Sequence, residues 1–421
     1  MAEKSKRRVV IAGAGVRGLC FARGMLNRVK DYSEFVALYD TNPARMQGFN
    51  NLLGTNIPMY TDFNKMVEEI KPTSMIVCVP DYKHPELIEM GFAAGLEVFT
   101  EKPMAMNREG IEKIRALEEK YGKKVIVTFN YRFTPHSQAL KKIMMQKPIG
   151  KIMSATFEWT LDLTHGQEYF HRWHAHLDKS GGLFVHKATH HFDLLNWILE
   201  DVPHSVYATG KRNVYGDAGS FRGKRCKGCE HRNSCWAVLK STLDDADLNP
   251  GSDGNIFDEL YFKAEHIDGY MRDGCCFDKE IDIYDTMNAV ITYESGTVVN
   301  YCLNAFSPIA GWKMTFNGEH GRIEVGKYEN ATRPENLKDK DYIRIFHGTT
   351  RQNVTMEEYL FEQLATAHGG GDDAMYDLLL GPGGEDPLGL AAGSIAGARS
   401  ALIGITANES VKSGKTEFIG L

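Results

Sequence analysis

Near its N-terminus the chain reads Arg8-Val9-Val10-Ile11-Ala12-Gly13-Ala14-Gly15-Val16-Arg17-Gly18. The apolar run is typical of a buried parallel strand, and a helical pattern over residues 19–26 follows the glycine-spaced turn. Gly13 permits the tight turn, Gly15 lets a pyrophosphate approach the backbone, and Gly18 lets the helix pack closely on the strand. We therefore predict a dinucleotide-binding turn, with the pyrophosphate at the helix N-terminus.

A second apolar segment, residues 35–40, supports this prediction because it ends in Asp40. An acid at the end of the second strand can hydrogen-bond the adenosine ribose and repel a 2′-phosphate, which favours NAD. Arg45 lies close enough in the sequence to leave NADP open. The competing interpretation makes Asp40 a turn residue at the end of the strand.

The sequence pattern changes once along the chain. Strand and helix patterns alternate from residue 8 to about residue 130, which predicts a parallel sheet with ligands at the carboxyl ends of its strands. Near residue 150 the pattern becomes a strict alternation of apolar and polar residues, first over residues 151–162. Such alternation is typical of strands in an open-faced sheet, and later pairs of alternating runs predict hairpins.

These patterns predict an α/β fold with two domains. We expect a Rossmann domain with a parallel sheet over residues 1–130. Residues 131–385 are expected to form an α/β (α+β) domain with an open, mainly antiparallel sheet and a cysteine-containing insertion at 213–280. Residues 386–421 are expected to form a helical segment that packs back on the body.

Composition limits the class of protein. The 421 residues carry a net charge of −6, and 43% are hydrophobic and 25% charged, which is ordinary for a globular chain and argues against a nucleic-acid platform. No apolar run approaches the roughly 20 residues that span a bilayer, so we expect no membrane partner. The apolar run that follows the basic N-terminus is too short for a signal peptide, which predicts a cytoplasmic protein. In that compartment the eight cysteines are expected to be thiols or metal ligands.

Three loops leave the predicted carboxyl edge of the parallel sheet: Pro80-Asp81-Tyr82-Lys83-His84, Glu101-Lys102-Pro103 and Asn130-Tyr131-Arg132. The glycine turn, the strand-end Pro80 with His84, and the Glu-Lys-Pro triplet together resemble the Gfo/Idh/MocA oxidoreductases. The later Ser180-Gly181-Gly182-Leu183, with His190 and Asp193, is similar to the glycine–helix signature of that family. The resemblance covers essentially the whole chain apart from the insertion.

The resemblance implies NAD(P)-linked redox chemistry on a small carbohydrate or polyol, carried out by a homo-oligomer. It also implies a set of residues around the cofactor: Gly13, Ala14, Gly15, Val16, Arg17, Gly18, Asp40, Pro80, His84, Glu101, Lys102 and Asn130.

Lys102 and a histidine cluster are the candidate catalytic residues. A lysine at a strand end, fixed by Pro103, can hold a substrate hydroxyl or share its proton if its pKa is lowered. A helix is expected from His186 onward, which would place His186 and His190 on one face, four residues apart. The family usually has a carboxylate where this chain has His186. We expect His190 to be the general acid/base because imidazole titrates near neutral pH, with His186 or Lys187 orienting the substrate.

Candidate substrate contacts lie in a segment dense in aromatic and basic groups, residues 169–174. Aromatic faces and planar donors suit a sugar ring and its hydroxyls, although an ordinary packed loop is an equally good interpretation. The expected contacts are Arg132, Arg172, Trp173, His174 and His191.

The insertion contains Cys226, Cys229 and Cys235, with Cys275 downstream. Four such thiols could hold a structural zinc ion tetrahedrally. An iron–sulfur cluster and unligated thiols are the alternatives.

Taken together, the residues and the resemblance predict an NAD-dependent oxidoreductase acting on a secondary hydroxyl of a sugar, glycoside or polyol. Two alternatives stay open. One is a glycosidase that retains NAD and cleaves by oxidation, elimination, hydration and reduction. The other is a non-catalytic nucleotide-binding regulator.

Overall fold

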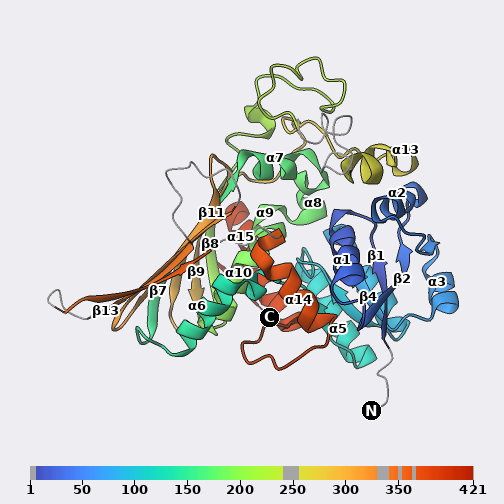
Figure 1. Ribbon diagram of the computed structural model, residues 1–421. Coiled ribbons are helices and arrows are strands. Elements are labelled where there is room, and N and C mark those ends of the chain that lie inside the picture. Colours follow the sequence, from blue (N-terminus) through green and yellow to red (C-terminus); the bar gives the residue numbers. More distant parts are fainter. Residues whose placement is uncertain (1–5, 240–255, 330–340, 349–352, 363–366, 421) are drawn as a thin grey trace, which may run out of the picture.

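The computed structural model describes residues 6–239, 256–329, 341–348, 353–362 and 367–420, and it has two sheet-centred domains side by side (Figure 1). The N-terminal sheet has the strand order β15 (Ala392–Gly393), β6 (Val125–Val127), β5 (Glu97–Thr100), β4 (Ser74–Val77), β1 (Arg7–Ala12), β2 (Ser33–Tyr39) and β3 (Met59–Tyr60). All neighbouring pairs are parallel except β15 with β6. The predicted Rossmann domain with a parallel sheet is therefore confirmed.

Helices cover both faces of this sheet, as its strand sequences require. Residues 9–12 of β1 are fully buried, and two separate apolar cores form on the two sides. A strand that is apolar on both faces needs a helical layer on each side. The helices of this domain are α1 (Val16–Asn27), α2 (Pro43–Leu53), α3 (Phe63–Ile70), α4 (His84–Ala93) and α5 (Arg108–Tyr121).

The second domain is built on a nine-stranded open sheet. Its order is β14 (Thr355–Phe361), β13 (Asp341–His347), β12 (Gly321–Glu329), β11 (Ala310–Gly318), β7 (Ile152–Asp162), β10 (Val298–Ser307), β9 (Thr286–Tyr293), β8 (Pro203–Lys211) and β16 (Glu417–Phe418). Only β7 and β10 pair in parallel among these described strands; the other neighbours are antiparallel. The mainly antiparallel sheet is confirmed. The hairpins predicted from the later pairs of alternating runs are also present, as β9 with β10 and β11 with β12.

Helices pack on one face of this sheet, and the other face stays open. The helical layer includes α6 (Pro135–Met145), α7 (Leu163–His171), α8 (Leu177–Ser180), α9 (Gly182–His186), α10 (Ala188–Leu199) and α15 (Ser394–Ser413). In β7, Phe157 and Trp159 are fully buried under it, while Glu158 is exposed. Met153, near the start of β7, was expected on the buried face but is 54% exposed, so the helical layer does not cover the start of this strand.

The C-terminal helix is shorter than expected. It begins at Ser394, whereas the helical pattern was expected from residue 386. Asp386 accepts hydrogen bonds from the backbone N–H groups of Leu390 and Ala391, and Gly389 has φ +65°, so this stretch forms a turn before the short strand β15. The helix α15 then packs against α10 and β8.

The predicted helix through the histidine cluster is also interrupted. The α9 helix ends at His186 and α10 begins at Ala188, with Lys187 between them. The backbone carbonyl of His186 accepts a hydrogen bond from the Lys102 ammonium, and the His190 N–H bonds to the Lys187 carbonyl, three residues back. The ammonium of Lys102 thus donates to the His186 carbonyl oxygen, which in a continuous helix would accept a hydrogen bond from the His190 N–H.

The insertion extends above the second domain and reaches back to the first (Figure 1). Its described part includes a π-helical turn at Asp258–Phe262 and the short helix α13 (Glu265–Asp268). Residues 240–255 of the insertion lie outside the described residues. In the described part of the chain, no helix is both long and apolar enough to cross a bilayer.

Candidate active site

A cleft of about 1680 Å³ opens between the two domains. The Rossmann domain contributes its glycine turn and the three loops at the carboxyl edge of its sheet. The second domain contributes α9, α10, the end of β12 and the segment around Trp173. Because ligands of parallel sheets bind at this edge, the cleft is the candidate active site.

The glycine turn has the geometry of a phosphate cradle. Gly13 has φ +109°, and a Cβ atom there would lie 2.5 Å from the Cys78 carbonyl oxygen. A Cβ atom at Gly18 would lie 2.4 Å from the Gly13 carbonyl oxygen, so the close packing expected of both glycines is present. Gly15 is the N-cap of α1 and has no side chain to cap the helix, and the first residues of α1, Val16 and Arg17, line the cleft with it. These residues fit a dinucleotide pyrophosphate.

Asp40 lies beside the turn and braces it. Its Oδ2 accepts a hydrogen bond from the Ala14 N–H at 2.8 Å, and its Oδ1 accepts one from the Asn42 N–H at 2.8 Å. Arg45 lies 3.5 Å from Asp40 Oδ1 and 2.6 Å from Asp268 Oδ2. Both predicted determinants of cofactor choice therefore line the cleft, and Arg45 is paired with carboxylates.

Arg17 belongs to a buried ionic network. Its guanidinium donates to Glu101 at 2.6 Å and forms two bonds to Asp372 at 2.9 and 3.0 Å. Asn130 also donates to Asp372, at 2.9 Å. Burial opposes ionisation of Glu101, but Arg17 and Lys102 hold its pKa below the ordinary value. The network fixes the residue that precedes Lys102.

His84 ties two loops of the sheet edge together. Its ring nitrogens lie 2.8 Å from the Pro103 carbonyl oxygen and 2.9 Å from the Val79 carbonyl oxygen. The ring is buried, and burial lowers its pKa. This contact holds the loop of Pro80 against the loop of Lys102.

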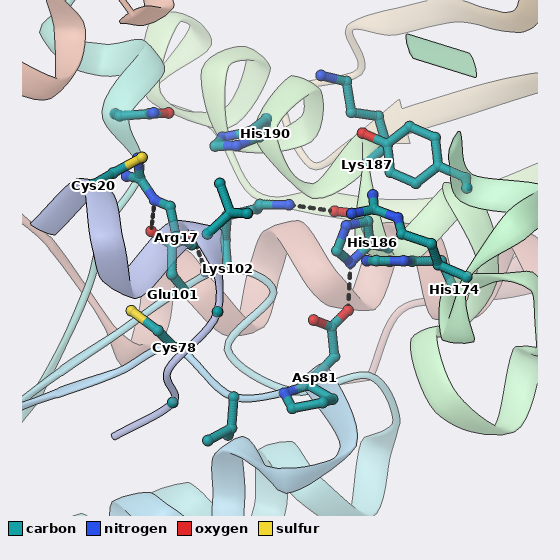
Figure 2. A pocket seen from close by; sticks show the side chains of 18 of the residues that line it. Arg17, Cys20, Cys78, Asp81, Glu101, Lys102, His174, His186, Lys187 and His190 are labelled. Atoms are coloured by element: carbon teal, nitrogen blue, oxygen red, sulfur yellow. Dashed lines mark hydrogen bonds and ion pairs between the residues drawn. The ribbon is translucent and has the colours of Figure 1, made fainter. Parts of the chain in front are cut away.

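Lys102 points across the cleft to the second domain (Figure 2). Its Nζ donates to the His186 carbonyl oxygen at 3.0 Å. Burial lowers the pKa of Lys102, although Asp81 and Glu101 oppose this shift. The predicted strand-end lysine is thus half-buried at the cleft and held in place, in a position where an ammonium can hold or share a proton.

His186 is held by a carboxylate of the other domain. Its Nδ1 lies 2.6 Å from Oδ2 of Asp81, which belongs to the 3₁₀ turn Asp81–Lys83 (Figure 2). Burial lowers the pKa of His186 well below its ordinary value and raises that of Asp81 well above. Both shifts favour the uncharged forms of the two side chains. One proton between Nδ1 of His186 and Oδ2 of Asp81 then makes the hydrogen bond between them.

The predicted substrate segment packs around His186. The rings of Trp173 and His174 stack with centroids 3.7 Å apart, and the His174 ring lies 4.3 Å from that of His186. Arg172 is paired with Glu168 at 3.4 Å. All three residues line the cleft, as a substrate contact requires.

His190 and Lys187 complete the wall of the cleft on the second domain. The His190 ring lies edge-on to Tyr131, with centroids 4.9 Å apart. The Lys187 ammonium lies over the rings of Trp159 and Tyr131, at 5.2 and 5.8 Å, and burial lowers its pKa to about 8. Lys102, His186, Lys187 and His190 therefore meet in one cleft, although they come from two domains.

Two predicted substrate contacts face the core instead. His191 is fully buried, stacks on Trp159 at 3.7 Å, and lies 2.7 Å from the Tyr301 hydroxyl. Arg132 makes a two-point ion pair with Asp193, at 2.6 and 2.7 Å. Neither residue is among those that line the cleft, so the structure does not support their assignment to the substrate. The turn of α10 that directs His190 outward directs its neighbour His191 inward.

Comparison with known proteins identifies the family. Residues 7–129 match the family model described as "Oxidoreductase family, NAD-binding Rossmann fold". Residues 141–416 match the companion model described as "Oxidoreductase family, C-terminal alpha/beta domain". The chain belongs to the Gfo/Idh/MocA oxidoreductase family. The NAD-binding character of this family agrees with the cradle at the glycine turn.

The similarity to individual relatives covers different fractions of the chain. YteT of Bacillus subtilis (strain 168), which carries the name of an oxidoreductase, is 31% identical over 94% of both chains. Inositol 2-dehydrogenase of Rhizobium meliloti (strain 1021) is 26% identical over 50% of this chain and 61% of its own. A levoglucosan dehydrogenase in complex with NADH and levoglucosan superposes with a TM-score of 0.65 at 14% identity, covering 99% of this chain and all of the other. The last likeness shows the shared fold of this oxidoreductase family.

The cysteines of the insertion do not have the arrangement of a metal site among the described residues. Cys226, Cys229, Cys235 and Cys275 line one small cavity, and all are free thiols. Among the described residues, no group of three or more His, Cys, Asp or Glu side chains could hold a metal ion. The expectation of structural zinc is therefore not supported.

The sequence reasoning missed several residues of the cleft. Asp81 was quoted within a loop at the sheet edge but was given no role, although its position after Pro80 was a usable signal. Tyr261, Asp268 and Tyr270 of the insertion also line the cleft, beside the cofactor turn. Glu329 accepts a hydrogen bond from the Tyr131 hydroxyl at the far end. The contacts from the insertion depend on a long-range fold and leave no local motif.

Proposed function

We propose that this protein is an NAD-dependent dehydrogenase that oxidises a secondary hydroxyl of a sugar, glycoside or polyol, or catalyses the reverse reduction. One observation carries the proposal. Lys102 of the Rossmann domain meets His186, Lys187 and His190 of the second domain in the cleft that begins at the glycine turn. The relatives named as inositol and levoglucosan dehydrogenases support a carbohydrate or polyol as the substrate class.

The residues at the glycine turn would hold the cofactor. The N–H groups at the start of α1 suit the pyrophosphate, and Asp40 suits the adenosine ribose. NAD, when bound, supplies the hydride-accepting nicotinamide. With Arg45 already paired with Asp40 and Asp268, a 2′-phosphate would have to compete with two carboxylates, which supports NAD over NADP.

The chain's own residues manage the proton of the substrate hydroxyl. We assign His190 as the general base that takes this proton and returns it in the reverse reaction. Lys102, with its lowered pKa, donates a hydrogen bond to the same oxygen and stabilises the charge that develops there. His186, held by Asp81, and Lys187 orient the remaining hydroxyls.

The experiment is a screen of sugars, polyols and aryl glycosides with NAD and with NADP. Each reaction is followed both for NADH or NADPH absorbance and for released aglycone. We expect NADH to accumulate with at least one sugar or polyol, with no aglycone released. Aglycone release without net reduced cofactor would replace the proposal with the NAD-retaining glycosidase. Binding of NAD without turnover of any substrate would favour the non-catalytic regulator.

A further inference from the structure

Residues 258–268 of the insertion lie on the Rossmann domain, although the insertion is part of the second domain in sequence. At Gly48 of α2, a Cβ atom would lie 2.3 Å from the Glu259 carbonyl oxygen, so glycine allows the two segments to touch. Asn51 donates to the Glu259 carboxylate at 3.1 Å, and Arg45 donates to the Leu260 carbonyl oxygen at 3.1 Å. These contacts hold residues 259 and 260 against α2, the helix that follows Asp40.

Partly buried ion pairs hold the insertion together around this segment and anchor it to its own domain. Arg272 pairs with Glu168 of α7 at 3.2 Å and lies over the Phe257 ring at 3.9 Å. Arg225 pairs with Glu265 at 2.8 Å and with Asp273 at 2.6 Å. The segment therefore bridges the two domains over one end of the cleft.

Tyr261 reaches from this bridge to the N-terminus of α1. Its hydroxyl accepts a hydrogen bond from the Val16 N–H at 3.3 Å, and a Cβ atom at Gly15 would lie 3.3 Å from the same hydroxyl. Val16 provides one of the N–H groups that a pyrophosphate uses in this fold. A phenol can also donate its proton, so Tyr261 can bind a phosphate oxygen at this position.

We propose that the insertion completes the cofactor site, with the Tyr261 hydroxyl donating a hydrogen bond to the pyrophosphate of the bound dinucleotide. Because the bridge covers this end of the cleft, the adenosine diphosphate half leaves only when the bridge moves away. The proposal rests on the proposed function only in taking NAD as the ligand. It is tested without substrate, so its failure and the failure of the dehydrogenase assignment give different results.

The test compares wild type with Tyr261→Phe, which removes the hydroxyl and keeps the ring. NADH and ADP-ribose affinities are measured by titration, and NADH release is measured by displacement in a stopped-flow fluorimeter. Both affinities should fall by about tenfold or more, since a hydrogen bond to a charged group is lost, and NADH release should be faster. The melting temperature of the ligand-free variant should fall only slightly, because the long hydrogen bond from the Val16 N–H is the interaction lost.

Tyr60→Phe is the matched control, because it removes a hydroxyl that donates to Glu69 at 2.8 Å in the same domain, away from the cleft. It should bind and release NADH as wild type does. Wild-type affinity and wild-type release of NADH in Tyr261→Phe would overturn the proposal. Tight NADH binding by wild type without turnover of any sugar would count against the proposed function alone.

Discussion

Asp81 and His186 join the two domains at the centre of the cleft, with Oδ2 of Asp81 2.6 Å from Nδ1 of His186. The resemblance to the family implied a carboxylate at the position of His186. In this chain a carboxylate of the Rossmann domain, Asp81, contacts the imidazole at that position. The pair fixes the orientation of the His186 ring, which lines the cleft.

Replacing Asp81 with Asn should therefore lower kcat by about 10- to 100-fold, because an amide in place of the carboxyl group changes the short hydrogen bond that fixes the orientation and tautomer of the ring. NADH affinity should stay unchanged, since Asp81 is not part of the glycine turn. Steady-state kinetics and NADH titration check both expectations. Asp62→Asn, which changes the carboxylate that caps α3 in the same domain, serves as the control. Wild-type kcat in Asp81→Asn would show that the pair has no part in turnover.

Cofactor preference should depend on Asp40. Removing its side chain in Asp40→Ala takes away a ribose acceptor and the negative charge that repels a 2′-phosphate. NAD should bind more weakly, and the preference for NAD over NADP should shrink. Titrations of wild type and variant with both cofactors measure this change. A wild-type preference for NADP would contradict the assignment of Asp40 to the ribose.

Lys187 should make stability depend on pH. Burial lowers its pKa from 10.5 to about 8, so between these values the unfolded chain binds more protons than the folded one. The free energy of unfolding should therefore rise as pH increases from about 8 to 10.5, because the cost of a buried ammonium is present below this range and disappears through it.

Lys187→Met should consequently stabilise the protein at pH 7, by up to about 3 kcal/mol, and this gain should shrink toward pH 10.5. Urea denaturation of both proteins at several pH values measures the difference. A gain that is equal at all pH values would show that Lys187 titrates normally in the folded chain.

The cofactor half of this site could be predicted from sequence because each of its segments directly follows a strand pattern along the chain. The glycine turn, Asp40 and the Glu101-Lys102-Pro103 triplet each follow a strand, and parallel strands end at one edge. The second domain was less predictable. Helical spacing alone gave no sign that Lys102 would take the His186 carbonyl and break the helix, or that Arg132 would pair with buried Asp193. These outcomes depend on contacts between residues 61 or more positions apart.

The central claim is that Lys102 and His190 act together on one substrate hydroxyl. The most direct measurement is turnover and NADH affinity for Lys102→Met, His190→Ala and the double variant. Each single change should lower kcat by about 10²–10⁴-fold and spare NADH binding, and the double variant should lose little more than the worse single one. If His190→Ala keeps near-normal turnover while His186→Ala or Lys187→Met loses it, the general base has been assigned to the wrong residue.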